Sequence, residues 1–515
     1  SGQHPIKRPD LQVAYYKKKI VEQLLPQIGE RIDVDSSAWG TIKTSLYFHN
    51  ETTAKINNFF SCLKIHKKNP IFGFDSLDKN NLSEIVPDVQ FRFSKYWKSN
   101  WTKEILYWLI PPHHSLNRDY KEIKLTDKQR QISENITGHM RIRGVAGSGK
   151  TFLLAYCAAL LSKQQHNVLI ISYNITLWHY IRHMMSKLPL SFSWSNITFN
   201  HFHGFCNDIL NQYGEKWDFS GDEEDIFRNK ITSKTLQILK KNNFEFFNKF
   251  DAILIDEGQD YYFEWYSFLT EILTSSNKLV VVCDKKQNIY NRNLSWLDKR
   301  KGGLDQFGDW IDLLSTMRLH PNLTNFINDF IDYYDLVEEK RKEIKIKSTA
   351  PILNEEDSHI IWKNSNESNW INETVHYFKI LKNNNINPSD VVVLLPNKNY
   401  GLKCVSAFKK LFNIECNHVF EEEDEEKRIH KHKKAFWPGD SRLKISTPHS
   451  FKGWESANVI VFIPENFKSS EFENDRLLYT SFTRAKINLI VINSNERYIK
   501  FGEKYSTEWV NKSLF

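Results

Sequence analysis

Residues 144–151 read Gly-Val-Ala-Gly-Ser-Gly-Lys-Thr, and this octapeptide constrains the fold more than any other segment of the chain. It satisfies the pattern G-x-x-x-x-G-K-[ST], in which backbone N–H groups surround the phosphates of a nucleotide. Residues 139–143 before it predict a buried strand, and residues 152–161 after it predict a helix whose N-terminus faces the phosphates. The segment therefore predicts a nucleoside triphosphate site between a strand and a helix.

The residue types in the octapeptide predict separate contacts with the nucleotide. We expect the Lys150 ammonium to reach the β- and γ-phosphates and the Thr151 hydroxyl to hold Mg²⁺. The other contacts come from the loop itself, because its N–H groups point at the phosphates. The loop residues expected at the phosphates are Gly144, Gly147, Ser148 and Gly149.

Length and composition exclude several classes of protein. A chain of 515 residues is too long for one compact core, so two to four domains are expected. No apolar run approaches the ~18 residues of a membrane span, so no membrane partner is expected, and a cytoplasmic location is predicted from the cysteines. The six cysteines lack C-x-x-C spacing, which indicates reduced thiols and disfavours a zinc or iron–sulfur site. The net charge of +8 permits a polyanionic partner without requiring one.

Short apolar runs alternate with helical patterns in both halves of the chain after residue 125. Runs of this length and composition are typical of buried parallel strands covered by helices on both faces. The pattern therefore predicts an α/β fold with two tandem parallel-sheet domains, of which only the first carries a phosphate loop. The predicted strands are 168–171, 252–255, 279–282, 391–395, 443–445, 459–462 and 489–492.

These patterns divide the chain into three predicted domains. Residues 1–118 form a smaller N-terminal accessory domain, for which docking to a partner or to DNA is favoured over nuclease chemistry. Residues 119–316 form the first α/β domain, with a short insertion at about 207–250. Residues 317–515 form the second α/β domain.

A second chemical signal follows the predicted strand at 252–255. Asp256 stands where the C-terminal end of a parallel strand faces the ligand crevice, so we expect it to hold Mg²⁺. Glu257 is placed to orient the attacking water as a general base. Phosphoryl transfer also needs positive charge, for which Arg318 and Arg484 of the second domain are the candidates.

Nine segments in order resemble the motifs of superfamily 1 helicases of the UvrD/Rep type. The resemblance implies two tandem RecA-like domains with ATP and Mg²⁺ between them, and it places arginine fingers at Arg318 and Arg484. Single motifs are weak signals, but nine in the family's order are specific. The segments are 125–129, 144–151, 172–174, 201–210, 256–260, 284–290, 314–318, 447–455 and 477–486.

The resemblance also implies roles for residues outside the phosphate loop. Gln129 would read adenine, and Gln287 would sense the γ-phosphate and couple it to DNA. Gly453 and Glu455 would belong to the nucleotide site, with Glu455 near the ribose.

Single-stranded DNA is the partner that the resemblance implies, with bases stacked on aromatic side chains. Two departures from the family pattern affect the sites. Met317 stands where an aromatic residue usually covers adenine, and Asn291 and Arg292 follow Tyr290 where the family often has a tryptophan. Two alternatives follow: Trp296 takes the place of that tryptophan, or the stacking pocket is absent. The residues expected at nucleic acid are Tyr173, Asn174, Phe202, His203, Tyr290, Trp296 and His449.

The leading hypothesis is an ATP-driven motor that moves along single-stranded DNA, with 3′→5′ movement implied by the resemblance alone. The short insertions indicate that the large rotating accessory subdomain is missing or vestigial. A second hypothesis is therefore a DNA-stimulated translocase or sensor that works beside a nuclease, in repair or in defence against foreign DNA. A third is a nucleotide-gated binding module. RNA is not excluded as the track.

Overall fold

The computed structural model describes residues 9–21, 35–61, 70–79, 94, 97, 125–186, 188–215, 222–298, 307–316, 319–336, 346–348, 358–421, 431–434, 436, 440–467, 469–506 and 508. Its contacts separate a smaller unit, residues 1–111 with 425–435, from a larger unit formed by residues 112–424 and 436–515. The domain boundaries at 118/119 and 316/317 stay predictions.

In the smaller unit, two short parallel strands pack against helices. Leu46 of β1 pairs with Ile71 of β2, and both side chains lie in a small core with Ile56 and Phe60. The N-terminal region also contains an aromatic-rich stretch, residues 91–101, of which the structure describes only Ser94 and Trp97. The described elements are α1 (Pro9–Lys19), η2 (Ser36–Thr41), β1 (Leu46–Phe48), α3 (Thr53–Phe60), β2 (Ile71–Gly73), η5 (Phe74–Lys79) and α18 (Lys431–Lys434).

The larger unit contains two six-stranded parallel sheets, which confirms the predicted fold class. The first sheet has the strand order β5-β4-β6-β7-β3-β8, so one strand, β7, separates the strand before the phosphate loop from the strand before Asp256. Its strands are β3 (His139–Gly144), β4 (Val168–Ser172), β5 (Ile197–His201), β6 (Phe250–Ile255), β7 (Leu273–Cys283) and β8 (Phe307–Leu313).

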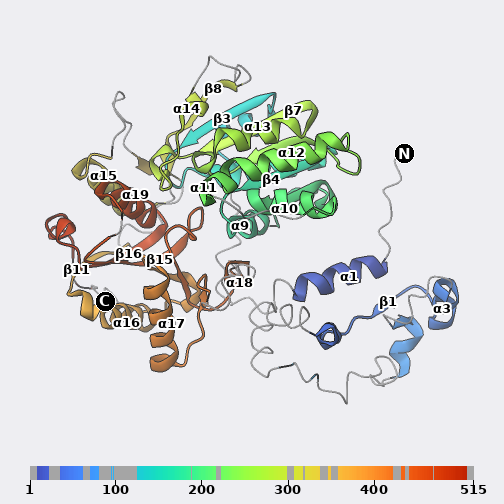
Figure 1. Ribbon diagram of the computed structural model, residues 1–515. Coiled ribbons are helices and arrows are strands. Elements are labelled where there is room, and N and C mark those ends of the chain that lie inside the picture. Colours follow the sequence, from blue (N-terminus) through green and yellow to red (C-terminus); the bar gives the residue numbers. More distant parts are fainter. Residues whose placement is uncertain are drawn as a thin grey trace. The chain divides into compact units, whose positions relative to one another are not determined.

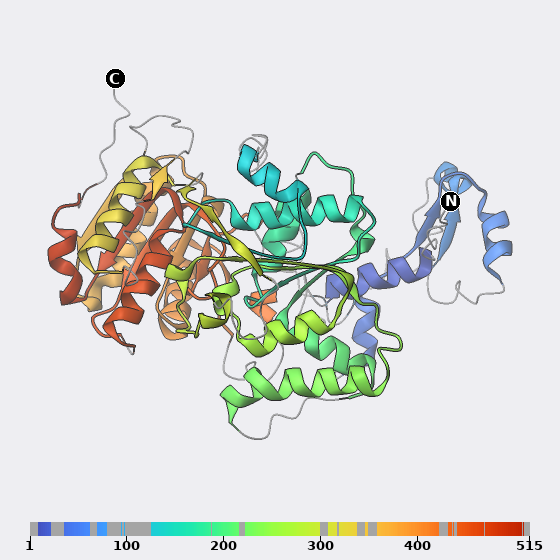
Figure 2. The same ribbon diagram turned by 90° about the horizontal axis from the view of Figure 1, so that it is seen from above.

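Both faces of the first sheet are buried. Successive strand residues point to opposite sides of the sheet, and on each side they lie in a hydrophobic cluster. Ile170 and Leu254 belong to one hydrophobic cluster, whereas Ile171 and Ile253 belong to another. Figure 2 shows α8 on one side of the sheet and α12 and α13 on the other. The helices are α7 (Asp127–Glu134), α8 (Lys150–Lys163), α9 (Leu177–Ser186), α10 (Phe202–Gln212), α11 (Glu223–Asp225), α12 (Ile231–Lys241), α13 (Phe263–Glu271) and α14 (Ser295–Asp298).

The predicted insertion at about 207–250 contributes to the core of this domain. Ile226, Ile231 and Leu239 are buried in the same cluster as Ile253 of β6. Where it is described, the insertion therefore packs onto the first sheet and does not form a separate lobe.

The second sheet has the strand order β11-β16-β15-β12-β14-β13. Figure 1 shows α15 and α19 on one side of it and α16 and α17 on the other. Its strands are β11 (Ile360–Asn364), β12 (Val391–Leu394), β13 (Asn417–His418), β14 (Lys444–Ser446), β15 (Ser456–Ile463) and β16 (Ala485–Asn493). The helices are α15 (Pro321–Tyr333), α16 (Trp370–Asn383), α17 (Lys398–Phe412), α19 (Glu471–Phe482) and α20 (Ile499–Gly502).

A short parallel pair, β9 (Ser315–Thr316) and β10 (Lys347–Ser348), completes the described strands of the larger unit. Within the described ranges, no helix combines the length and the apolar character that crossing a bilayer requires.

Candidate nucleotide and nucleic-acid site

The phosphate loop connects the end of β3 to the start of α8, as predicted from the sequence. Gly147 and Gly149 have φ angles of 74° and 79°, a region that side chains disfavour and glycine adopts freely. Gly149 is the N-cap of α8, so the first N–H groups of that helix face the loop. The glycines thus allow the backbone to form a concave surface of donors at a helix N-terminus, which suits a phosphate.

Lys150 lies inside this loop and is only 8% exposed. Its Nζ donates to Gly144 O at 2.9 Å and to Val145 O at 3.0 Å. The Asp284 carboxylate lies 3.8 Å from the same nitrogen. The ammonium is therefore held against the loop, where we expect the phosphates.

Thr151 and Asp256 lie together, and their oxygens fit a divalent cation. The Thr151 hydroxyl is close enough to the Asp256 carboxylate to act on the pKa of that carboxylate, which it lowers. Asp256 Oδ2 is buried without a hydrogen-bond partner among the described residues, and so is Ser148 Oγ. Burial, aided by the charge of Glu257, raises the pKa of Asp256 to about 7. A buried carboxylate oxygen with nothing to bind suits a hard cation such as Mg²⁺, which prefers oxygen ligands.

Glu257 follows Asp256 in a left-handed backbone conformation, with φ of 54°. Its Oε2 accepts a hydrogen bond of 2.5 Å from Gln259 Nε2. Burial acts to raise its pKa, but the positive charges of Lys452, Lys150 and Arg484 outweigh burial and hold the pKa below the ordinary value. This carboxylate is therefore ionised and oriented, as a general base requires.

Gln129 is buried beside the phosphate loop. Its Nε2 donates to Ser148 O at 3.0 Å, and its Oε1 accepts from the N–H of Thr126 at 3.0 Å in a capping box. The side chain therefore fixes the start of α7 to the loop. One donor hydrogen and one acceptor lone pair of this amide remain for the adenine contact that we predicted.

Charged groups from the second sheet meet the loops of the first sheet in a contact that we call the seam: residues 256–260 and 284–287 on one side, and 449–455 and 480–484 on the other. Arg484 Nη2 donates to Gln287 Oε1 at 2.6 Å. Lys452 Nζ donates to Asp260 Oδ1 at 2.6 Å and to Gln287 O at 2.7 Å. The Gln287 amide also donates to Asp284 Oδ2 at 2.9 Å, so it connects Arg484 to the carboxylate beside Lys150.

The other predicted nucleotide contacts have different surroundings. Gly453, with φ of 83°, packs against Leu177 of the first domain, and a Cβ there would lie 2.5 Å from Leu177 Cδ1. Glu455 forms an ion pair with Lys486 of β16. Met317 and Arg318 lie outside the described residues.

Four of the seven residues predicted to bind nucleic acid form one half-buried aromatic group. Tyr173 packs edge-on against Tyr290, with ring centroids 5.0 Å apart, and His203 lies 6.0 Å from Tyr173. His449 of the second domain lies 5.6 Å from Tyr290. These rings line the seam from both sides, as bases stacked between two domains would need.

The other three predicted nucleic-acid residues have different environments. Phe202 is fully buried and stacked on Trp265 at 4.6 Å. Trp296 has an exposure of 5%, and its indole N–H donates to Tyr261 O at 3.3 Å, so it is a core residue and not a replacement for the family's tryptophan. Asn174 Nδ2 lies 3.0 Å from Lys452 O, so its amide clamps the seam.

Comparison with known protein families agrees with this two-sheet arrangement. Residues 129–293 match the family described as AAA domain, and residues 443–492 match the family described as UvrD-like helicase C-terminal domain. The two matches support a UvrD/Rep-like superfamily 1 helicase. No curated protein matches the chain significantly. The UvrD-like match implies an ATP-hydrolysing enzyme that acts on nucleic acid.

Several seam residues of this UvrD-like helicase received no role from the sequence. Lys452, Asp260 and Asp284 lie within the motifs that carry the resemblance, but the motifs do not say which charges face one another. Arg292 was noted only as a departure from the family. The sequence does offer one signal for these residues. They are charged side chains that stand inside motifs, where a role at the site is more expected than an exposed surface position.

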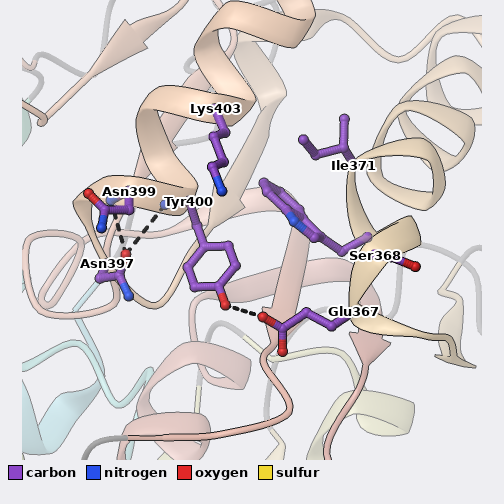
Figure 3. A pocket seen from close by; sticks show the side chains of 8 residues that line it. Glu367, Ser368, Ile371, Asn397, Asn399, Tyr400 and Lys403 are labelled. Atoms are coloured by element: carbon purple, nitrogen blue, oxygen red, sulfur yellow. Dashed lines mark hydrogen bonds between the residues drawn. The ribbon is translucent and has the colours of Figure 1, made fainter.

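A separate cavity of about 550 Å³ lies in the second domain, away from the seam. Figure 3 shows Tyr400 donating its hydroxyl hydrogen bond to Glu367, and Asn397 capping the helix at Asn399 and Tyr400. The Glu367 carboxylate also accepts from the N–H of Glu465 at 2.7 Å. None of the predicted site residues lines this cavity.

Proposed function

We propose that this UvrD-like helicase is an ATP-driven translocase on single-stranded DNA, with ATP bound in the seam. Lys150 and the N–H groups of the phosphate loop would hold the phosphates on one side, and Arg484 with Arg318 would complete the site from the other. Support comes from the 2.6 Å contact between Arg484 and Gln287, which brings a guanidinium of the second domain to the edge of the nucleotide site.

In the proposed hydrolysis, a water molecule attacks the γ-phosphorus while the Glu257 carboxylate accepts its proton. The bond between that phosphorus and the β–γ bridging oxygen breaks, and its electron pair leaves with ADP. Arg484 stabilises the negative charge on the transferring phosphoryl group. Mg²⁺ held by Thr151 and Asp256 would supply charge neutralisation at the phosphate oxygens.

Movement would follow because the same residues join the nucleotide to both domains. Gln287 contacts Arg484 and Lys452 of the second domain and Asp284 of the first. A change at the γ-phosphate that displaced Arg484 would therefore alter the seam, and with it the aromatic group formed by Tyr173 and Tyr290. The family resemblance supports a 3′→5′ direction.

The test measures ATP hydrolysis by the full chain with single-stranded DNA, duplex DNA, RNA and no nucleic acid. We expect stimulation by single-stranded DNA and its loss in Lys150→Ala. The matched control is Lys163→Ala, an exposed lysine at the other end of α8. DNA-stimulated hydrolysis that persisted in Lys150→Ala would refute the assignment. Displacement of streptavidin from one labelled end of the strand reports direction.

A second candidate is a DNA-stimulated ATPase or sensor that works beside a nuclease, in repair or in defence against foreign DNA, and does not unwind alone. The insertion at about 207–250 favours this candidate. Its described residues Ile226, Ile231 and Leu239 belong to the core of the first sheet, so little of the insertion is left to form a separate accessory lobe. A strand-displacement assay of the purified chain separates the two candidates. A nucleotide-gated binding module, the third alternative, predicts hydrolysis that nucleic acid does not stimulate.

A further inference from the structure

Arg292 lies in the aromatic group at the seam with its guanidinium against a ring. Its Cζ is 3.8 Å from the centroid of Tyr262, which is stacking distance, and 5.8 Å and 5.9 Å from the centroids of Tyr290 and Tyr173. A guanidinium covered by one ring keeps its plane fixed while its N–H groups remain available at the edge. The Arg292 side chain is therefore preorganised beside Tyr173 and Tyr290, which we predicted to contact single-stranded DNA.

Asp260 and Glu224 act on the charge of Arg292, but neither forms an ion pair with it. The Nε atoms of Arg292 and Arg228 are both buried without a hydrogen-bond partner among the described residues, and burial is the main cause that lowers the pKa of Arg292. Arg228 offers a direct comparison, because it lies 4.8 Å from the same Tyr262 ring but forms an ion pair of 3.0 Å with Glu264. Of these two arginines on one ring, only Arg228 is paired with an acid. A ring-stacked guanidinium that forms no ion pair among the described residues suits an anionic ligand.

The backbone of Arg292 is connected to the nucleotide side of the seam. Asn288 Oδ1 accepts from the Arg292 N–H at 2.9 Å, and Asn288 Nδ2 donates to Arg292 O at 2.8 Å. Asn288 follows Gln287, whose side chain binds Arg484. The two hydrogen bonds thus hold Arg292 to the segment that contacts the second domain.

We propose that Arg292 binds a backbone phosphate of the single-stranded DNA track, an inference that rests on the proposed function. Relatives of the UvrD type often have a tryptophan at this place in the motif, which would hold the strand by stacking on a base. In this chain the contact is electrostatic. It is indifferent to base identity and weakens with salt, because each phosphate that a cation neutralises releases counterions.

The experiment measures binding of a fluorescent oligothymidylate to the full chain by anisotropy over a series of salt concentrations. Arg292→Gln should weaken binding about tenfold at low salt, as expected for loss of a charge-assisted hydrogen bond. The slope of log affinity against log salt should become shallower by about 0.7, the value for one phosphate contact on a single strand. Arg292→Lys should keep the slope, and the control Arg228→Gln should bind within about twofold of the unaltered chain.

The outcomes separate this inference from the proposed function. If the unaltered chain binds and is stimulated by the strand, but Arg292→Gln has the same affinity and slope, the inference is refuted and the proposed function stands. If the unaltered chain neither binds nor is stimulated, the proposed function fails and the inference with it. Thermal melting checks the fold of Arg292→Gln. If melting falls below that of Arg228→Gln, Arg292→Met, which keeps the aliphatic packing on Tyr262, replaces it in the same comparison.

Discussion

Lys452 and Asp260 form a buried ion pair across the seam, with Nζ and Oδ1 2.6 Å apart and each side chain 1% exposed. The lysine comes from the second domain and the aspartate from the first. Burial raises the pKa of Asp260, and the contact with Lys452 offsets part of that rise. Asp260 is four residues after Asp256, and the charge of Lys452 also lowers the pKa of Glu257, so the packing of the two domains determines the charge around the predicted catalytic carboxylates.

Removing the lysine should destabilise the chain strongly. Lys452→Met leaves Asp260 buried without its partner, a change that costs about 3–5 kcal/mol in comparable buried pairs. Urea unfolding measures the loss. The matched control is Lys504→Met, because Lys504 pairs with Asp329 at 3.1 Å on the surface and should contribute less than about 1 kcal/mol. Equal effects of the two variants would contradict a special role for the seam pair.

Arg484→Ala should reduce the ATP turnover rate far more than nucleotide affinity, and because Arg484 is buried and donates to Gln287 it should also lower the free energy of unfolding. An arginine finger acts mainly on the transition state, and its loss costs about 10³-fold or more in kcat. Steady-state hydrolysis and titration with a fluorescent nucleotide measure the two quantities. The control is Arg476→Ala. Arg476 lies on α19 with its guanidinium carbon 4.2 Å from the centroid of the Phe472 ring, and it has no role in the proposed mechanism. A kcat near that of the unaltered chain would remove Arg484 from the proposed mechanism.

Gly453→Ala should disturb the seam by more than the backbone cost of its left-handed conformation. The new Cβ would lie 2.5 Å from Leu177 Cδ1, an overlap that costs about 1–3 kcal/mol in a packed interior. Gly214→Ala isolates the backbone cost, because Gly214 has φ of 73° and open space around its Cα. The free energy of unfolding should fall further in Gly453→Ala, and Leu177→Ala in the same chain should recover part of the difference. Equal losses of stability at both glycines would show that Leu177 moves aside and accommodates the new Cβ at position 453.

His203 should make the chain less stable in mild acid. Burial lowers its pKa to about 4 from an ordinary value of 6.5. A histidine with a lowered folded-state pKa contributes stability above pH 6.5 that is lost as pH falls through 4, because the unfolded state takes up the proton first. The loss approaches about 3 kcal/mol at 1.36 kcal/mol per pKa unit.

Urea unfolding from pH 7 to pH 4 tests this dependence as a difference between variants. His203→Phe should lose less stability than the unaltered chain over that interval, whereas the exposed His376→Phe should match the unaltered chain. Parallel pH profiles for the unaltered chain and His203→Phe would show that His203 takes up its proton in the folded state as readily as in the unfolded chain.

Local patterns in the sequence were sufficient to predict the two parallel sheets and the phosphate loop. The apolar runs, such as 252–255, identify strands because a strand buried on both faces must be apolar throughout. The octapeptide identifies its loop because the required backbone conformations and donors come from neighbouring residues. Periodicity and turn chemistry are short-range properties, so one chain segment carries all the information about them.

The pairing of charges and the burial of single side chains were decided only by the tertiary structure. Lys452 reaches Asp260 across 192 positions of sequence, and Arg484 reaches Gln287 across 197. Trp296 was expected at the track but lies in the core, because Tyr261 O satisfies its indole N–H there. Such contacts depend on how two domains pack, and no local pattern encodes which distant residues packing will bring together.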